Sequence, residues 1–93
     1  MSSSPLLSII VNCFNGERYL SECLKSILQQ TYENYEVIFW DNKSLDNSKK
    51  IFLEIQDKRF KYFTDNEHVS LYFARNKALN FVAGKYISFL DVD

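Results

Sequence analysis

The sequence predicts an α/β fold of three layers (α/β/α), with helices on both faces of a mainly parallel four-stranded sheet. Four short runs rich in β-branched and aromatic residues alternate with three segments in which apolar residues recur at helical spacing. The resulting β-α-β-α-β-α-β order, with short connections, favours right-handed crossovers between parallel strands over a sandwich or a helical bundle. The 93 residues are 46% hydrophobic and 16% aromatic, with only two Gly and one Pro, which indicates one packed domain.

The first two elements are a strand and a helix. Residues 6–11 form an apolar run without alternation, which suits a strand that is covered on both faces. After Asn15-Gly16, apolar residues recur at helical spacing from Tyr19 to Leu28, with Asn15 as a candidate N-cap. We therefore expect a helix of about three turns after the strand.

The second strand is expected at residues 35–40, where β-branched and aromatic side chains are enriched. The polar stretch 41–48 follows it. Within that stretch Ser44 or Asp46 can cap a short helix whose apolar residues reach Ile55.

The remaining elements are a short strand, a helix and a final strand. We expect the third strand at residues 60–63 and a third helix from Leu71 to Val82, on the spacing of its apolar residues. Gly84 suits the end of that helix, and residues 85–90 form the fourth strand.

Composition and cysteine spacing exclude several classes. A net charge of -1, from 11 basic and 12 acidic residues, gives no general attraction to nucleic acid, so we expect no nucleic-acid partner. Cys13 and Cys23 form no Cys-x-x-Cys pair, and we expect two reduced, mostly buried thiols. Residues 1–5 are interpreted as a polar leader and residues 6–93 as the domain. No apolar run is long enough for a signal peptide or a membrane span, so we expect a cytoplasmic location.

Ligands of parallel α/β sheets bind beyond the carboxyl ends of the strands, where helix N-termini also point. In this sequence the rule selects four segments: residues 12–16, 41–46, 66–76 and 91–93. Within them, Asp46 and His68 are interpreted as parts of a polar turn and a polar loop. Neither a P-loop nor a G-x-G-x-x-G motif is present to hold phosphates, so a metal ion on the terminal acids is the available source of positive charge.

Four ionisable residues in these segments are candidates for a binding site, and each also has a plainer interpretation. Asp91 and Asp93 are separated by a single residue at a strand end, so both can reach one Mg²⁺ or Mn²⁺ ion. The plainer interpretation is that they form a solvated strand end. Asp41 can accept a hydrogen bond from a base or ribose, or bond within its own turn. Arg75 lies among apolar helical residues, where its charge needs a phosphate or an acidic partner.

Taken together, these segments resemble glycosyltransferase family 2, the large GT-A group that transfers sugars from nucleotide-sugar donors. The resemblance runs from about Leu6 to Asp93 and rests on four blocks in order: residues 8–15, residues 35–46, Ala74-Arg75-Asn76, and residues 84–93 with Asp91-Val92-Asp93. It implies a Rossmann-like GT-A fold, of which residues 6–93 would be the N-terminal, nucleotide-sugar-binding part. We expect the domain to be truncated and to hold no catalytic residue, because the family's general base is an acid beyond residue 93.

The resemblance also implies a role for each site residue. Nucleotide binding would fall to Asn12, Cys13, Phe14, Asp41, Arg75 and Asp91. The backbone of residues 12–14 would frame the base, Asp41 would contact it, and Arg75 would support the base or the nearby acids. Asp91 would face the ribose or the waters of the metal ion, and Asp93 would coordinate the Mn²⁺ or Mg²⁺ ion on the donor diphosphate. Asn12 stands where the family usually has Pro, and Asn42 replaces a frequent second acid.

The implied function is inverting, metal-dependent transfer of a sugar from a nucleotide diphosphate-sugar, with UDP-sugar favoured, to an acceptor hydroxyl. The acceptor would be a saccharide or lipid-linked molecule in bacterial cell-surface polysaccharide biosynthesis, and the parent enzyme would work at the inner face of the membrane. The chain alone would bind nucleotide and metal without turnover, and its uncovered sheet edges favour a homo-oligomer. The alternatives are a non-catalytic α/β nucleotide-binding or structural module, and a flavodoxin-like signalling domain, which would need an acid at Asn42.

Overall fold

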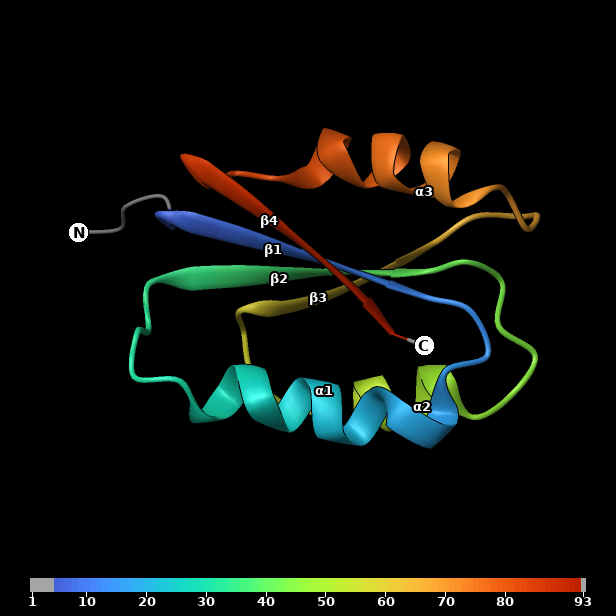
Figure 1. Ribbon diagram of the computed structural model, residues 1–93, viewed down its shortest axis with the longest axis horizontal. Helices are drawn as coiled ribbons and strands as arrows, with labels where there is room; N and C mark the ends of the chain where they lie inside the picture. Colours follow the sequence, from blue (N-terminus) through green and yellow to red (C-terminus); the bar gives the residue numbers. More distant parts are fainter. Residues whose placement is uncertain (1–4, 93) are drawn as a thin grey trace.

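The computed structural model describes residues 5–92 as an all-parallel sheet between two layers of helices (Figure 1). The strands are β1 (Leu7–Cys13), β2 (Tyr35–Asp41), β3 (Phe60–Thr64) and β4 (Tyr86–Val92), in the spatial order β3-β2-β1-β4. The helices are α1 (Glu17–Gln29), α2 (Ser48–Leu53) and α3 (Leu71–Ala78), and a 3₁₀ turn, η1 (Leu79–Phe81), follows α3. Figure 1 shows α1 and α2 on one face of the sheet and α3 on the other, so the predicted α/β/α layers and element order are confirmed.

The two faces of the sheet bury separate apolar cores, because successive residues of a strand point to opposite faces. The core toward α1 and α2 is the larger, and the rings of Phe39 and Phe52 stack there with centroids 4.2 Å apart. The buried residues of the smaller core toward α3 are Ile10, Ile38, Trp40, Ala74 and Ala78. The two alanines of α3 have small side chains, which lets this helix lie close to β1 and β2.

All four strands extend further toward their carboxyl ends than the sequence predicted. β1 ends at Cys13, β2 at Asp41, β3 at Thr64 and β4 at Val92, each one or two residues beyond the expected end. Parallel pairing continues through these polar residues because each backbone finds partner groups on its neighbour; Asn12, for example, lies opposite Asp91. Several predicted site residues therefore lie in strands, where the direction of each side chain is fixed.

The start of α1 also differs from the prediction. The N-cap residue is Gly16, which has no side chain to accept a hydrogen bond. Asn15 takes a left-handed φ of 51° and accepts a hydrogen bond from the Leu45 N–H through Oδ1 at 2.7 Å. The Glu17 N–H donates to Asp46 Oδ2 at 3.1 Å, so the loop after β2 supplies an acceptor from outside the helix. The expectation that Asn15 caps this helix is therefore wrong.

At the amino ends of the strands, the connection from α3 to β4 packs closely against β1. The Gly84 N–H donates to Ser8 Oγ at 2.8 Å, and a Cβ atom at residue 84 would lie 2.7 Å from the backbone nitrogen of Ser8. Ser8 Oγ in turn donates to the buried carboxylate of Glu36 at 2.6 Å. A glycine at residue 84 therefore allows β4 to enter the sheet beside β1.

Two further expectations concern the thiols and the membrane. Both cysteines are free thiols, with Cys13 buried and Cys23 half-buried, and burial raises the pKa of the Cys13 thiol. Within residues 5–92, no helix has both the length and the apolar character that crossing a bilayer requires. Most of the expected polar leader lies outside the described residues.

Candidate functional site

A pocket of about 330 Å³ lies at the carboxyl ends of β1 and β4. Its wall combines the end of β1, the start of the loop after β2, the loop that leads into α3, the first turn of α3 and the end of β4. The chain proceeds from β1 to β2 and β3 on one side and then returns to place β4 on the other side of β1. The pocket therefore lies at the point where the strand order reverses, which is where open α/β sheets bind their ligands.

The structure brings most of the predicted nucleotide-binding residues together at this pocket. Asn12, Cys13 and Phe14 from β1 and its loop line the pocket on one side, and Asp91 from β4 lines it on the other. Arg75 from α3 reaches the same place, because its Nη2 donates to Asp91 Oδ2 at 2.6 Å. Three segments that are far apart in the sequence thus meet at one edge of the sheet.

The ion pair between Arg75 and Asp91 connects α3 to the end of β4. The side chains of Arg75 and Asp91 are 39% and 31% exposed, so the pair lies at the surface and contributes little to stability by itself. The Arg75 guanidinium also lies 5.4 Å from the centroid of the Phe89 ring, a cation–π distance. The pair therefore orients a carboxylate and a cation at the pocket, where both remain within reach of a charged ligand.

Asp41 lies elsewhere than the other predicted residues. Its carboxylate is buried, does not line the pocket, and accepts hydrogen bonds from the Ser44 N–H at 2.9 Å and the Tyr62 hydroxyl at 2.6 Å. Burial raises the pKa of Tyr62, and the hydrogen bond to Asp41 raises it further. The side chain of Asp41 thus fixes the turn after β2, and its contact with a base stays a prediction.

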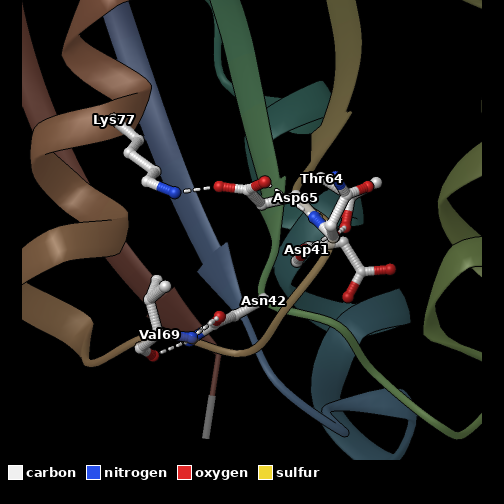
Figure 2. A network of polar contacts seen from close by, with 7 residues as sticks. Asp41, Asn42, Thr64, Asp65, Val69 and Lys77 are labelled. Atoms are coloured by element: carbon white, nitrogen blue, oxygen red, sulfur yellow. Dashed lines mark hydrogen bonds and ion pairs between the residues drawn. The ribbon is translucent and has the colours of Figure 1, made fainter.

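Asn42, the next residue, holds the loop before α3 against the end of β2 (Figure 2). Its Nδ2 donates to the Val69 carbonyl at 2.6 Å, and its Oδ1 accepts from the Val69 N–H at 2.9 Å. An acid at residue 42 would lack the donor that the Val69 carbonyl uses. Figure 2 also shows the ion pair between Lys77 and Asp65, which fixes the other end of this loop to α3.

His68, which the sequence analysis interpreted as part of a polar loop, lines the pocket. Its ring packs against that of Phe14 with centroids 4.3 Å apart at a 56° tilt, and its Nδ1 lies 3.0 Å from the Asn42 carbonyl oxygen. Together the two rings form an aromatic part of the pocket wall, on which a planar ligand can stack. Only the position of His68 in the polar connection before α3 pointed toward this site.

The predicted metal site is only partly described. Asp91 offers carboxylate oxygens, the donors that Mg²⁺ and Mn²⁺ prefer, whereas Asp93 lies outside residues 5–92. Within the described range, no three His, Cys, Asp or Glu side chains gather into a group that could hold a metal. The single carboxylate fits a hard cation that also takes phosphate and water oxygens, and the metal role of Asp91 and Asp93 stays a prediction.

The sequence matches the model of one protein family and several curated proteins. The model of the family described as "Glycosyl transferase family 2" matches residues 8–93. The Escherichia coli protein "UDP-Glc:alpha-D-GlcNAc-diphosphoundecaprenol beta-1,3-glucosyltransferase WfgD" is 40% identical over 88 residues, which are 95% of this chain and 35% of the relative. The Bacillus subtilis protein "Putative teichuronic acid biosynthesis glycosyltransferase TuaG" is 33% identical over 91 residues, 96% of this chain and 36% of that protein.

Solved structures give the same picture of the fold. The crystal structure of Staphylococcus aureus TarS 1-349 in complex with UDP superimposes with a TM-score of 0.89 at 28% identity, covering 95% of this chain and 27% of that one. The chain thus spans about a third of the length of the two curated relatives above.

Proposed function

The chain belongs to glycosyltransferase family 2, and from that premise we propose that its pocket binds the nucleotide of a sugar-nucleotide donor, a UDP-sugar, for transfer of the sugar. The observation that carries the proposal is the meeting of residues 12–14, Arg75 and Asp91 at the reversal of the strand order. A crystal structure of TarS, which shares the fold at 28% identity, is a complex with UDP, and this supports the proposal.

Each part of the pocket suits a part of such a donor. The rings of Phe14 and His68 can stack on the base, since aromatic faces and nucleobases are both planar and polarisable. Asp91 can accept hydrogen bonds from ribose hydroxyls, and Arg75 can pair with either an acid or a phosphate. The pocket volume of about 330 Å³ is enough for the nucleoside part of the ligand.

The proposed reaction places the leaving diphosphate near the end of β4. With Asp93, Asp91 would hold a Mn²⁺ or Mg²⁺ ion, which when bound would neutralise the charge of the departing nucleoside diphosphate. The transfer would invert the anomeric carbon, with the general base supplied from beyond residue 93. Donor and metal binding, rather than proton transfer, are then the tasks of the residues in this chain.

The acceptor and the location are proposed from the relatives' names. A diphosphoundecaprenol-linked acceptor in one relative and teichuronic acid synthesis in another support a saccharide or lipid-linked acceptor in cell-surface polysaccharide synthesis. Such an acceptor would place the protein in the cytoplasm, at the inner face of the membrane.

A titration of the chain with UDP, with and without Mn²⁺, tests the proposal. We expect binding that is weak but tightens with Mn²⁺, and an Asp93→Ala variant that loses the effect of the metal. Asp57→Ala is the matched control, since Asp57 pairs with Arg59 near the amino end of β3, away from the pocket. If the UDP affinity changes neither with Mn²⁺ nor with the Asp93→Ala substitution, a non-catalytic binding module is favoured.

Turnover is tested separately. With UDP-glucose and a saccharide acceptor, the purified chain should show no steady transfer. Sustained release of UDP together with a glycosylated product would contradict the proposal that the chain needs a general base from outside.

A further inference from the structure

Most polar side chains in the pocket wall are already engaged within the chain. Those with a hydrogen-bond partner are Asn42, His68, Ser70 and Asp91. Asn42 uses both of its amide atoms on Val69, and Ser70 accepts from the Phe73 N–H at the start of α3. These groups shape the pocket, and most of their donor and acceptor atoms are already bonded to other residues of the chain.

Asn12 is different. Its side chain is only 5% exposed, it lies in β1 next to Asp91 of β4, and neither Nδ2 nor Oδ1 has a hydrogen-bond partner among residues 5–92. Unpaired buried amide groups are rare and destabilise the fold, because their contacts with water are lost without replacement. A strand residue that carries this cost at a pocket points to a group supplied by a ligand.

We propose that Asn12 is a specificity-determining residue, whose carboxamide pairs with the lactam edge of the donor's uracil base. This inference rests on the proposed function. A carboxamide offers one donor group beside one acceptor, and uracil offers the complementary N3–H beside a carbonyl oxygen. The rings of Phe14 and His68, which are tilted against each other, lie in the same wall and suit the face of that base.

The amide can reach the ligand at small cost. Both amide atoms are shielded from solvent in the described conformation, so the side chain must rotate to face the pocket. The rotation breaks no hydrogen bond to residues 5–92, since none holds the amide where it is. The Nε1 of Trp40, which is paired with Asn12 in the register of β1 and β2, also lacks a hydrogen-bond partner among residues 5–92. A water molecule shared by the two residues is therefore the competing explanation.

Substitution by leucine distinguishes the two explanations through stability. Leu has nearly the shape of Asn but no hydrogen-bonding groups, so Asn12→Leu removes an unpaired amide from an apolar setting. If the amide serves the ligand, the variant should unfold at an equal or higher temperature than the wild type. If a buried water or Trp40 holds the amide, the variant should unfold at a lower temperature, which would overturn the proposal.

Ligand binding gives the second readout. The ligands are UDP, the N3-methylated analogue of UDP, and ribose 5-diphosphate, which has no base. For UDP we expect Asn12→Leu and Asn12→Ala to bind about 10-fold more weakly than the wild type, the effect of roughly two neutral hydrogen bonds. For ribose 5-diphosphate the wild type and variants should bind equally, because the proposed partner atoms are absent. N3-methylation should weaken binding to the wild type more than binding to the variants, because the methyl group blocks the proposed contact with Asn12. The ¹⁵N–¹H signals of the Asn12 amide should also shift with UDP.

The outcomes separate this inference from the proposed function. UDP affinity that is equal in the wild type and both variants overturns the role of Asn12 and leaves the proposed function standing. A wild-type chain that binds neither UDP nor ribose 5-diphosphate, with or without Mn²⁺, overturns both. Asn80→Leu, an exposed change in η1 outside the pocket, controls for nonspecific effects of a new leucine.

Discussion

At the scale of single residues, the carboxylate of Glu36 holds three segments together at the amino ends of the strands. It is 2% exposed and accepts hydrogen bonds from Ser8 Oγ and the Ala83 N–H, both at 2.6 Å, and from Lys61 Nζ at 2.9 Å. Burial by itself raises the pKa of Glu36, but the hydrogen bonds and the Lys61 charge together outweigh it and lower the pKa below its ordinary value.

This lowered pKa predicts a stability that depends on pH. Since the carboxyl binds its proton less readily in the folded chain, its stabilisation is complete above the unfolded pKa of about 4.3 and is lost as pH falls through the lower folded pKa. A Glu36→Gln variant should be about 2–3 kcal/mol less stable at pH 7, because the charge-assisted hydrogen bonds are lost. Urea unfolding between pH 7 and pH 3 should show this difference shrinking at the acid end. A difference that is constant over the whole range would contradict the role of the charge.

The amide of Asn42 gives a second prediction at this scale. Asn42→Asp removes the donor to the Val69 carbonyl and places a charged oxygen near it, so we expect a loss of about 1–3 kcal/mol. Amide hydrogen exchange in residues 65–70 should accelerate, since that loop would lose its attachment to β2. The matched change Asn47→Asp, at the start of α2 where Asn47 makes no side-chain cap, should leave exchange in the loop unchanged.

The direction in which each strand side chain points explains which site residues could be predicted from the sequence. The positions of Asn12 and Asp91 at strand ends were enough to place them at one edge of a parallel sheet. Asp41 was grouped with them because β2 was expected to end at residue 40. In the structure Asp41 is the last residue of β2, so its side chain points to the same face as Phe39, toward α2. The contact of His68 with Phe14 joins two loops, and no local pattern encodes such a contact.

At the scale of elements, each of the two glycines of the chain lies where another segment approaches its Cα closely. A Cβ at Gly84 would lie 2.7 Å from the Ser8 nitrogen and 2.9 Å from the Leu7 carbonyl carbon, which are backbone atoms. A Cβ at Gly16 would instead meet side-chain atoms, 2.8 Å from Val92 Cγ1 and 2.9 Å from Cys13 Sγ. Side chains can shift more readily than a paired strand.

We therefore predict that alanine substitution destabilises the fold more at Gly84 than at Gly16. Gly84→Ala should cost about 2–3 kcal/mol, because β1 and the entry to β4 must separate, while Gly16→Ala should cost about 1 kcal/mol or less. Thermal unfolding of the two variants beside the wild type measures the difference. A larger loss for Gly16→Ala would show that the start of α1, rather than the entry to β4, is the tighter contact.

The element boundaries were less predictable than the elements themselves. Asp46 illustrates why: one carboxylate oxygen accepts from the Glu17 N–H of α1, and the other from the Ser48 N–H of α2. Burial opposes its ionisation, but these hydrogen bonds outweigh burial and lower the pKa of Asp46. The spacing of apolar residues predicts that a helix exists, but such an acceptor from a distant loop decides where α1 begins.

At the scale of the whole molecule, β4 is an edge strand with apolar side chains on both of its faces. Tyr86, Ile87, Phe89 and Leu90 are all exposed in residues 5–92. An edge strand offers unpaired backbone groups, and exposed apolar residues beside them favour association. The expectation of a homo-oligomer remains a prediction, and this strand is the surface on which it depends.

Light scattering over a wide concentration range tests that prediction. We expect the apparent mass of the chain to rise with concentration, and a Phe89→Lys variant to stay closer to the monomer mass, because the charge opposes contact between edges. Leu45→Lys is the control, since Leu45 is 84% exposed in the loop after β2, a strand that β1 separates from β4 in the sheet. A monomer mass at every concentration in the wild type would contradict the prediction.

The position of β1 between β2 and β4 also bears on how the chain is made. Leu7 at the start of β1 pairs with Tyr86 at the start of β4, so one side of this central strand stays unpaired until β4 has been synthesised. At a synthesis rate of roughly 5–20 residues per second, the open side of β1 exists for several seconds on the ribosome. Contacts between such distant residues also slow folding after release. The early β1-α1-β2 unit must therefore remain soluble with an apolar edge uncovered, a period in which chaperones can bind it.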